Sequence, residues 1–320
     1  WQELESALAE TLTPGQRIAL EYSEIDRIPQ LDRVPAGVLD LVRKAGVHPQ
    51  ESSELVTLFS SVWSDAELES HRKTAGTLAD VAGKAFTQAS EALRDGRGLS
   101  EWELKGLILA KLAEAGLTDI DAIVAVGPNS ADGHYEPTAG NAAPIEADRV
   151  LLIDLWGRES GSVFADQTWM GYTGETIPKP VERVWRSVFE ARTAAVDYLK
   201  QHFGNSEEPV RGCDVDEACR KVVREAGFED AFTHRTGHSI DSELHGLGPN
   251  IDSVETPDER QLLAGIGFSI EPGIYLAGEF GVRSEINVHL AKAGPEVTTP
   301  NPQGEIYALM GDAWNSSNAR

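Results

Sequence analysis

Two pairs of carboxylates stand inside apolar stretches of this 320-residue sequence. The first pair is Asp154 in "LLIDLW" and Asp166 in "VFADQTW". The second pair is Glu271 in "FSIEPGIY" and Glu285 in "GVRSEINV". A buried carboxylate is costly unless it is paired or bound to a cation, and like charges on neighbouring strands repel. Either aspartate alone is more simply interpreted as facing solvent, but a shared cation site is the more economical account of all four.

Two histidines, His238 and His245, lie seven residues apart in the turn-rich segment 235–255. They could belong to a metal site, form an acid–base pair, or be loop residues without a role. One imidazole added to four carboxylates gives a donor set that suits a pair of divalent ions and favours manganese, cobalt or zinc over a calcium cage. Two such ions, about 3.5–4 Å apart, can share a hydroxide and polarise a carbonyl group.

The carboxylate pairs are expected on two hairpins. Residues 149–157 and 162–170 read as the strands of the first hairpin, and residues 267–276 and 280–290 as those of the second. Pro272 directly follows Glu271 and removes a ladder hydrogen bond, so this end of the strand is not expected to be central.

Helical patterns precede each hairpin. Ser100 and Glu103 form a capping box at the start of one helix. The other predicted elements of this region are helices at 65–93, about 179–203 and 214–226, and a strand at 121–126. The order helix, helix, loop, hairpin therefore occurs twice, as a loose internal repeat.

The first 64 residues have a different texture. A strand at 17–23 and a helix at 35–46 are predicted there, followed by a mixed apolar segment. This is too few strands to close a sheet, so the segment is interpreted as the last part of a small α/β domain. The predicted divisions of the chain are 1–64, a catalytic domain at 65–311 and a tail at 312–320.

Charge and composition exclude several classes of function. A net charge of −24 and a pI of about 4.7 disfavour binding to nucleic acid or to an anionic membrane surface. No apolar run approaches the ~20 residues of a transmembrane helix. The two cysteines, Cys213 and Cys219, are interpreted as ordinary thiols, which fits a reducing compartment and a cytoplasmic location. Because the chain opens on Trp1, its targeting is left open.

Four motifs resemble those of the pita-bread metallopeptidases, family M24, and in particular its proline-specific branch of prolidase and aminopeptidase P. The most specific is "SIEPGIYLAGEFGVRSE", which resembles the prolidase signature around both glutamates. The others are "HRTGH", "LHGLGP" and "NSADGHYEP", which present His238, His245 and His134. The resemblance covers about 65–308 and implies an α+β pita-bread domain with pseudo-twofold halves.

The resemblance also implies a role for each site residue. The five metal ligands would be Asp154, Asp166, His238, Glu271 and Glu285. Asp166 and Glu285 would bridge two divalent ions, with manganese expected first and cobalt or zinc as alternatives. Glu271 would in addition be the general base. His134 and His245 would stabilise the tetrahedral intermediate and assist the leaving nitrogen. Arg283 either orients a ligand carboxylate or forms an ordinary ion pair.

The function implied is that of a homodimeric exopeptidase that cleaves the bond between an N-terminal residue and proline through a metal-bridging hydroxide. Its substrate would be a short peptide with proline at the second position, and dipeptidase and aminopeptidase activity both remain open. One alternative is a diverged pita-bread hydrolase acting on a non-proline or non-peptide C–N bond. Others are a metal-free creatinase-like hydrolase and a non-catalytic binding protein, which the full set of ligand types disfavours.

Several positions depart from the resembled pattern. Asp154 and Asp166 are twelve residues apart instead of eleven, so the hairpin must absorb one residue or the aspartates would face opposite sides. Trp169 predicts a more apolar substrate pocket. Arg235 places a long cation beside His238 and, with Arg260 in the following loop, is a candidate to hold a substrate carboxylate. Gly246 follows His245, where relatives often have an acid.

Overall fold

The computed structural model describes residues 2–24, 27–312 and 314. Most of the predicted tail at 312–320 lies outside these residues. Over the described part of the chain, no helix is both long enough and apolar enough to cross a membrane.

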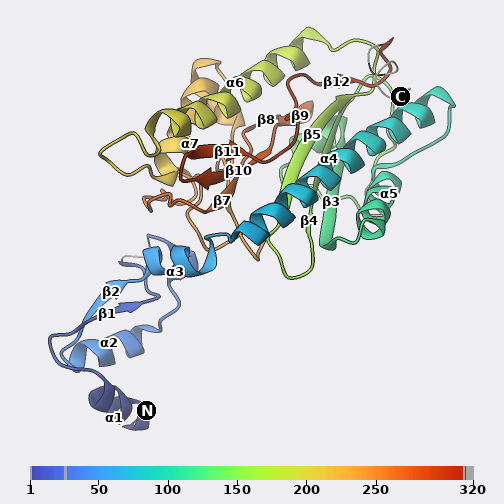
Figure 1. Ribbon diagram of the computed structural model, residues 1–320. Helices are drawn as coiled ribbons and strands as arrows, with labels where there is room; N and C mark the ends of the chain where they lie inside the picture. The colour runs from blue at the N-terminus through green and yellow to red at the C-terminus, as the bar shows by residue number, and fades with distance from the viewer. Residues whose placement is uncertain (1, 25–26, 313, 315–320) are drawn as a thin grey trace.

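The N-terminal residues form a small unit that projects from the body of the molecule (Figure 1). Its elements are α1 (Gln2–Thr11), β1 (Arg17–Leu20), η2 (Pro29–Leu31), α2 (Ala36–Lys44), β2 (His48–Glu51) and α3 (Ser53–Ser60). The strands β1 and β2 pair in parallel, and α2 lies between them in the sequence. This is the β–α–β arrangement of an α/β domain. The predicted helix at 35–46 corresponds to α2, and the predicted strand at 17–23 ends earlier, at Leu20.

The first half of the body is a sheet covered by two helices (Figure 1). Its elements are α4 (Asp65–Arg94), α5 (Glu101–Glu114), β3 (Thr118–Val126), η3 (Gly127–Ala131), β4 (Val150–Arg158) and β5 (Ala165–Tyr172). The predicted capping box of Ser100 and Glu103 is present, and a second one, Ser64 with Glu67, begins α4. A short strand, β12 (Tyr307–Ala308), completes the sheet in the order β12-β5-β4-β3.

The second half repeats this plan. Its elements are α6 (Lys179–His202), α7 (Gly212–Glu225), η4 (Glu229–Ala231), β6 (Ser239–Ile240), β7 (Gly267–Ile270), β8 (Gly273–Leu276), β9 (Phe280–Arg283), β10 (Ile286–Ala291) and β11 (Gly294–Val297). The sheet order is β11-β10-β7-β6, so β6 and β7 correspond to β3 and β4 of the first half. One apolar core joins α6 and α7 to this sheet and to β4 and β5.

The register of the first hairpin places its two aspartates on one face. Asp154 pairs with Thr168, and Asp166 pairs with Trp156. Because directly paired residues share a face and side chains alternate with period two, all four side chains point to the same side. The spacing of twelve therefore does not separate the aspartates. The opposite face, with Ile153 and its neighbours, packs against α4 and α5.

The second hairpin is broken, whereas the sequence predicted continuous strands. One ladder pairs β7 with β10, and a separate ladder pairs β8 with β9. At the break the N–H of Glu271 donates to the carbonyl of Thr236 at 2.6 Å, and that of Ser284 donates to Pro272 at 3.2 Å. Proline has no N–H to continue the ladder. Glu271 and Glu285 both lie at this break, outside the strands, so strand alternation does not fix the side to which their side chains point.

Candidate metal centre

Three buried side chains from both halves meet where the two sheets adjoin. Asp166 in β5, His238 just before β6 and Glu285 just before β10 each offer one ligand atom, and these atoms lie within 4.8 Å of one another. His238 Nε2 is 3.4 Å from Asp166 Oδ2 and 3.5 Å from Glu271 Oε1. The side-chain oxygen of Asn287 in β10 accepts the N–H of Asp166 at 2.9 Å, which ties the two sheets together beside this cluster.

The hydrogen bonds of His238 fix its tautomer. Its Nδ1 lies 3.1 Å from the carbonyl oxygen of Ser239, which can only accept, so Nδ1 carries the hydrogen. Nε2 is left with its lone pair directed at the carboxylates, and this is the form of imidazole that binds a metal ion. Ser269 Oγ accepts the N–H of His238 at 2.9 Å and donates to Glu271 Oε1 at 3.0 Å, which holds the two side chains in a fixed relation.

The carboxylates of the cluster lack partners that they need. Asp154 Oδ1, Asp166 Oδ1 and Glu285 Oε1 are buried and accept no hydrogen bond from the described residues. Burial, reinforced by neighbouring carboxylates, raises the pKa of Asp166 and of Glu285 well above their usual range. Orphaned buried oxygens beside an imidazole lone pair form a donor set that fits divalent cations, which would replace the missing partners.

Glu271 and Asp154 differ from the other two carboxylates in their surroundings. Burial raises the pKa of Glu271, but the nearby His238, His234 and Arg283 outweigh burial and leave this pKa below its ordinary value. Asp154 forms an ion pair with the Arg283 guanidinium, yet burial dominates and raises the pKa of Asp154. Glu271 is therefore ionised at neutral pH, which is the state that a general base needs before it can accept a proton.

Arg283 belongs to a chain of hydrogen bonds that reaches two predicted ligands. Its Nη2 donates to Asp154, and its Nε donates to Thr168 Oγ1 at 2.8 Å. Thr168 Oγ1 in turn donates to Glu285 Oε2 at 2.8 Å. Sequence reasoning missed Thr168 and also Ser269. Thr168 lies two residues from Asp166 in the same strand, so period-two alternation could have identified it, and Ser269 lies two residues before Glu271 at the end of β7.

Replacing Thr168 with valine is expected to lower the affinity for Mn²⁺ by about 10- to 100-fold, the usual cost of losing a partner that orients a metal ligand. Valine keeps the shape of threonine but cannot receive the Arg283 hydrogen bond or orient Glu285. Titration calorimetry on metal-stripped protein measures this. Thr193→Val, which removes a similar hydroxyl from the exposed side of α6, is the control. Equal affinities of Thr168→Val and the unmodified protein would contradict the prediction.

The two histidines predicted to assist catalysis lie in different settings. The ring of His245 is perpendicular to that of His238, with centroids 4.4 Å apart. Burial and the nearby His238 and Arg235 lower the pKa of His245 to about 4, so it is neutral at pH 7. His134 is exposed after η3, where its N–H donates to Asp132 Oδ1 at 3.0 Å. No hydrogen bond or ion pair within the described chain joins the His134 side chain to the cluster.

The prediction that Trp169 faces the substrate is wrong. Trp169 pairs with Ile153, so it lies on the opposite face of the sheet from Asp166 and packs in the core beneath α4 and α5. Its indole stacks on Tyr307, with ring centroids 6.5 Å apart. Two aromatic residues of this hairpin, Trp156 and Tyr172, share the face of the aspartates.

The two candidate cations for a substrate carboxylate also differ. Arg260 is buried, forms an ion pair with Asp258, and donates to the carbonyls of Leu247 at 2.7 Å and Gly248 at 2.8 Å. Its guanidinium is thus used to hold the loop that follows His245. Arg235 forms an ion pair only with Glu255 among the described residues, at 3.6 Å, and its charge lowers the pKa of His238 and of His245.

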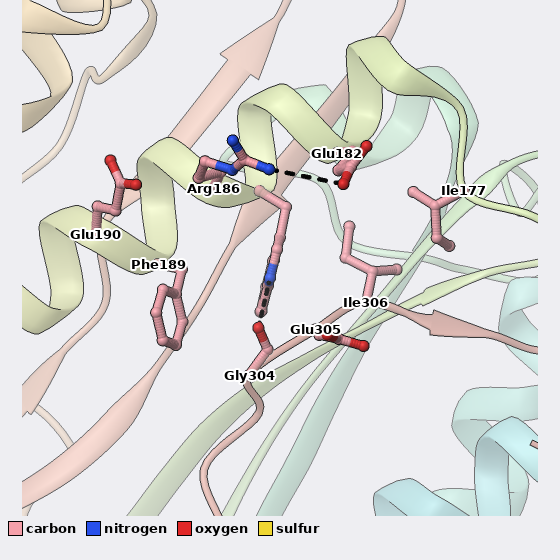
Figure 2. Close-up of a pocket in the computed structure, with 9 residues that line it drawn as sticks. Ile177, Glu182, Arg186, Phe189, Glu190, Gly304, Glu305 and Ile306 are labelled. Atoms are coloured by element: carbon pink, nitrogen blue, oxygen red, sulfur yellow. Dashed lines mark hydrogen bonds and ion pairs between the residues drawn. The ribbon is translucent and has the colours of Figure 1, made fainter. Parts of the chain in front are cut away.

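A large cavity lies elsewhere, between α6 and the segment before β12 (Figure 2). It has a volume of about 630 Å³ and is lined by aromatic side chains of α6, by the aliphatic side chains of Ile177 and Ile306, and by glutamates. Trp185 Nε1 donates to the Gly304 carbonyl at 3.1 Å, and Arg186 pairs with Glu182 at 3.7 Å. None of the predicted ligands lines this cavity, so the candidate site rests on the buried cluster.

Known proteins are similar to this chain over most of its length. A curated Xaa-Pro dipeptidase of Lactobacillus delbrueckii subsp. lactis is 33% identical over 292 residues, which is 88% of this chain and 73% of that protein. The structure of dipeptidase PepE from Mycobacterium ulcerans matches with a TM-score of 0.71 at 25% identity, covering 87% of this chain and 70% of that one. X-Pro aminopeptidase from Thermotoga maritima MSB8 matches with a TM-score of 0.67 at 25% identity, covering 96% and 78%.

The similarity to known structures confirms the predicted α+β pita-bread fold. The family model described as metallopeptidase family M24 matches residues 74–292, which is more than half of the sequence. This segment contains all five residues predicted to bind metal. The chain therefore belongs to metallopeptidase family M24.

Proposed function

We propose that the protein is a dinuclear-metal exopeptidase that hydrolyses the bond between an N-terminal residue and proline. The observation that carries the proposal is the buried group of Asp166, His238 and Glu285, whose ligand atoms lie within 4.8 Å of one another beside orphaned carboxylate oxygens. Asp154 and Glu271 complete the proposed ligand set. Manganese is the proposed native metal, and an Xaa-Pro dipeptide or a longer peptide with proline second is the proposed substrate.

The roles of the side chains follow from their surroundings. Two divalent ions, when bound, would supply an activated water molecule and polarise the scissile carbonyl. Glu271, which its lowered pKa keeps ionised at neutral pH, accepts a proton from the attacking water and passes it to the leaving proline nitrogen. His245 is neutral and can donate an N–H to the tetrahedral oxygen. Arg283 holds Asp154 and, through Thr168, Glu285.

The first experiment is hydrolysis by metal-stripped protein with and without added Mn²⁺. Ala-Pro and Ala-Pro-Ala are assayed side by side, with His238→Ala as the variant that cannot bind metal fully. Manganese-dependent release of alanine from Ala-Pro alone supports a dipeptidase, and release from the tripeptide supports an aminopeptidase. Metal binding without cleavage of either peptide would reject proline specificity and favour the diverged-hydrolase alternative.

Arg235 is proposed to hold the free carboxylate of a dipeptide substrate. Replacing it with glutamine should raise KM for Ala-Pro by about tenfold or more, because a hydrogen bond to a charged group contributes about 1.5–3 kcal/mol. KM for Ala-Pro-Ala, whose carboxylate lies one residue further away, should change little. Steady-state kinetics on both peptides test this, with Arg186→Gln of α6 as the control. An equal rise in both KM values would contradict the proposal.

The homodimer implied by the family resemblance is retained as a proposal. Light scattering or sedimentation of the purified chain measures the mass directly, and a monomer at micromolar concentration would reject it.

A further inference from the structure

The turn that carries His245 is closed by one buried carboxylate, that of Asp241. Its Oδ1 accepts the N–H of Glu243 at 2.8 Å, and its Oδ2 accepts the N–H of Leu247 at 3.0 Å. The same Oδ2 accepts the hydroxyl of Ser61 at 2.9 Å. Only 2% of Asp241 is exposed. His245 lies inside the span from 243 to 247 that this single side chain fastens at both ends.

Gly246 explains why the carboxylate can occupy this place. A Cβ built on Gly246 would lie 2.5 Å from Asp241 Oδ2 and 2.7 Å from Asp241 Cγ. The Asp241 carboxylate thus fills the volume into which a side chain at 246 would project. Position 246 carries no side chain, and a carboxylate reaches the same volume from five residues earlier in the chain.

Asp241 also joins the turn to the rest of the molecule. Its hydrogen bond from Ser61 comes from the linker between α3 and α4. Trp63 of the same linker donates its Nε1 hydrogen to the carbonyl of Ile240 at 2.9 Å. The carbonyl of Asp241 accepts the N–H of Phe164, just before β5, at 3.1 Å. The α3–α4 linker and the segment before β5 therefore hold Asp241 in place, and Asp241 in turn holds the turn that carries His245.

We propose that Asp241 is a positioning residue for His245, and that its carboxylate substitutes for a side chain at position 246. This inference rests on the proposed catalytic role of His245. Asp241 touches neither the proposed ligands nor the substrate through any described contact, and it acts by holding the backbone on both sides of the histidine. Without it, the N–H groups of Glu243 and Leu247 lose their partner, and the imidazole is held less firmly beside His238.

The catalytic consequence is tested by a double-mutant cycle. Asp241→Asn is expected to lower kcat by about 10- to 100-fold, because a displacement of about 1 Å at a reacting group costs on that order. Metal content and KM should stay close to those of the unmodified protein. In a His245→Ala background the same substitution should change kcat by less than about twofold. Multiplicative losses in the double variant would overturn the proposal. Asp32→Asn, a loop aspartate that accepts one backbone N–H far from the site, is the control.

The exchange of positions gives an independent test. Gly246→Asp alone should lower kcat, because its Cβ would collide with the Asp241 carboxylate. Asp241→Gly alone should lower kcat by loosening the turn. The double variant Asp241→Gly with Gly246→Asp should have a higher kcat than either single variant. A double variant no better than the worse single one would count against the substitution of one carboxylate for the other.

A readout that needs no activity separates this inference from the proposed function. Amide hydrogen exchange of residues 243–247 should be faster in Asp241→Asn than in the unmodified protein, because the amide side chain cannot accept from both backbone N–H groups. If the unmodified protein cleaves no Xaa-Pro peptide, the proposed function fails. Hydrogen exchange alone then tests whether Asp241 anchors the turn at residues 243–247. Unchanged protection of the Leu247 N–H would overturn the inference in either case.

Discussion

Glu285→Gln is expected to abolish most hydrolysis while stabilising the metal-free protein. The amide is a weaker ligand for a divalent ion, so transition-state stabilisation of several kcal/mol is lost and kcat/KM falls by about 1000-fold or more. In the metal-free protein the same change removes a buried carboxyl group whose ionisation is opposed by burial and by Asp166, an effect that the nearby Arg283 does not outweigh. Relief of that desolvation and repulsion should raise stability by about 1–3 kcal/mol.

Both effects are measurable on one preparation. Hydrolysis of Ala-Pro is assayed with added Mn²⁺, bound metal is counted by mass spectrometry, and Tm is recorded in excess chelator. Glu305→Gln, an exposed glutamate beside the α6 cavity, should change none of these. A variant that loses activity but has a lower metal-free Tm than the unmodified protein would show that Glu285 supports the fold by itself. That result would contradict the interpretation that the carboxylate cluster destabilises the protein when no metal ion is bound.

Acid is expected to destabilise the protein through His71, which is fully buried in α4. Its Nδ1 lies 2.6 Å from the carbonyl of Phe164 and its Nε2 lies 2.7 Å from Thr298 Oγ1. Burial lowers the pKa of His71 from 6.5 to about 4, against the opposing effect of the Phe164 carbonyl. The unfolded chain therefore binds a proton first as the pH falls. The part of the free energy of unfolding that depends on a neutral His71 is fully present above about pH 6.5. It is lost between pH 6.5 and 4, by on the order of 3 kcal/mol in total.

Urea unfolding at several pH values between 7.5 and 4.5, in chelator, tests this. His71→Gln keeps a polar side chain at the site but does not titrate, so its free energy of unfolding should fall less steeply with acid than that of the unmodified protein. Other histidines with a lowered pKa, such as His245, contribute equally to both proteins and cancel in the difference. Parallel curves for the two proteins over this range would contradict the prediction.

Much of the framework followed from local patterns. The capping box at Ser100, the long helices and the first hairpin obey rules that act within a few residues, and the structure has them close to the predicted bounds. The break in the second hairpin was only half visible. Pro272 showed that one ladder hydrogen bond was missing, but the new partner of the Glu271 N–H is Thr236, which lies outside the hairpin.

Facing and pairing were harder to predict. The position of Trp169 in the motif suggested the substrate side, whereas the register decides the face, and it turns the indole into the core. The sequence suggested that Arg260 was available to bind a substrate carboxylate. In the structure, its guanidinium is held by Asp258 and by two backbone carbonyls. Asp258 is a near neighbour in the sequence, but the two carbonyl partners come from a tertiary contact that leaves no trace in residue spacing. The ligand roles of all five residues stay predictions until metal is bound and counted.

The order in which the proposed ligands are synthesised determines when the cation site can form. Thr168 and Glu285, joined by one hydrogen bond, are 117 residues apart in the chain. At about 5–20 residues per second, synthesis from Asp154 to Glu285 takes roughly 7–26 s. During that time the first hairpin has its aspartates but no partner half, and closure brings further carboxylates against them. The proposed cation site is therefore complete only after residues of both halves have been synthesised.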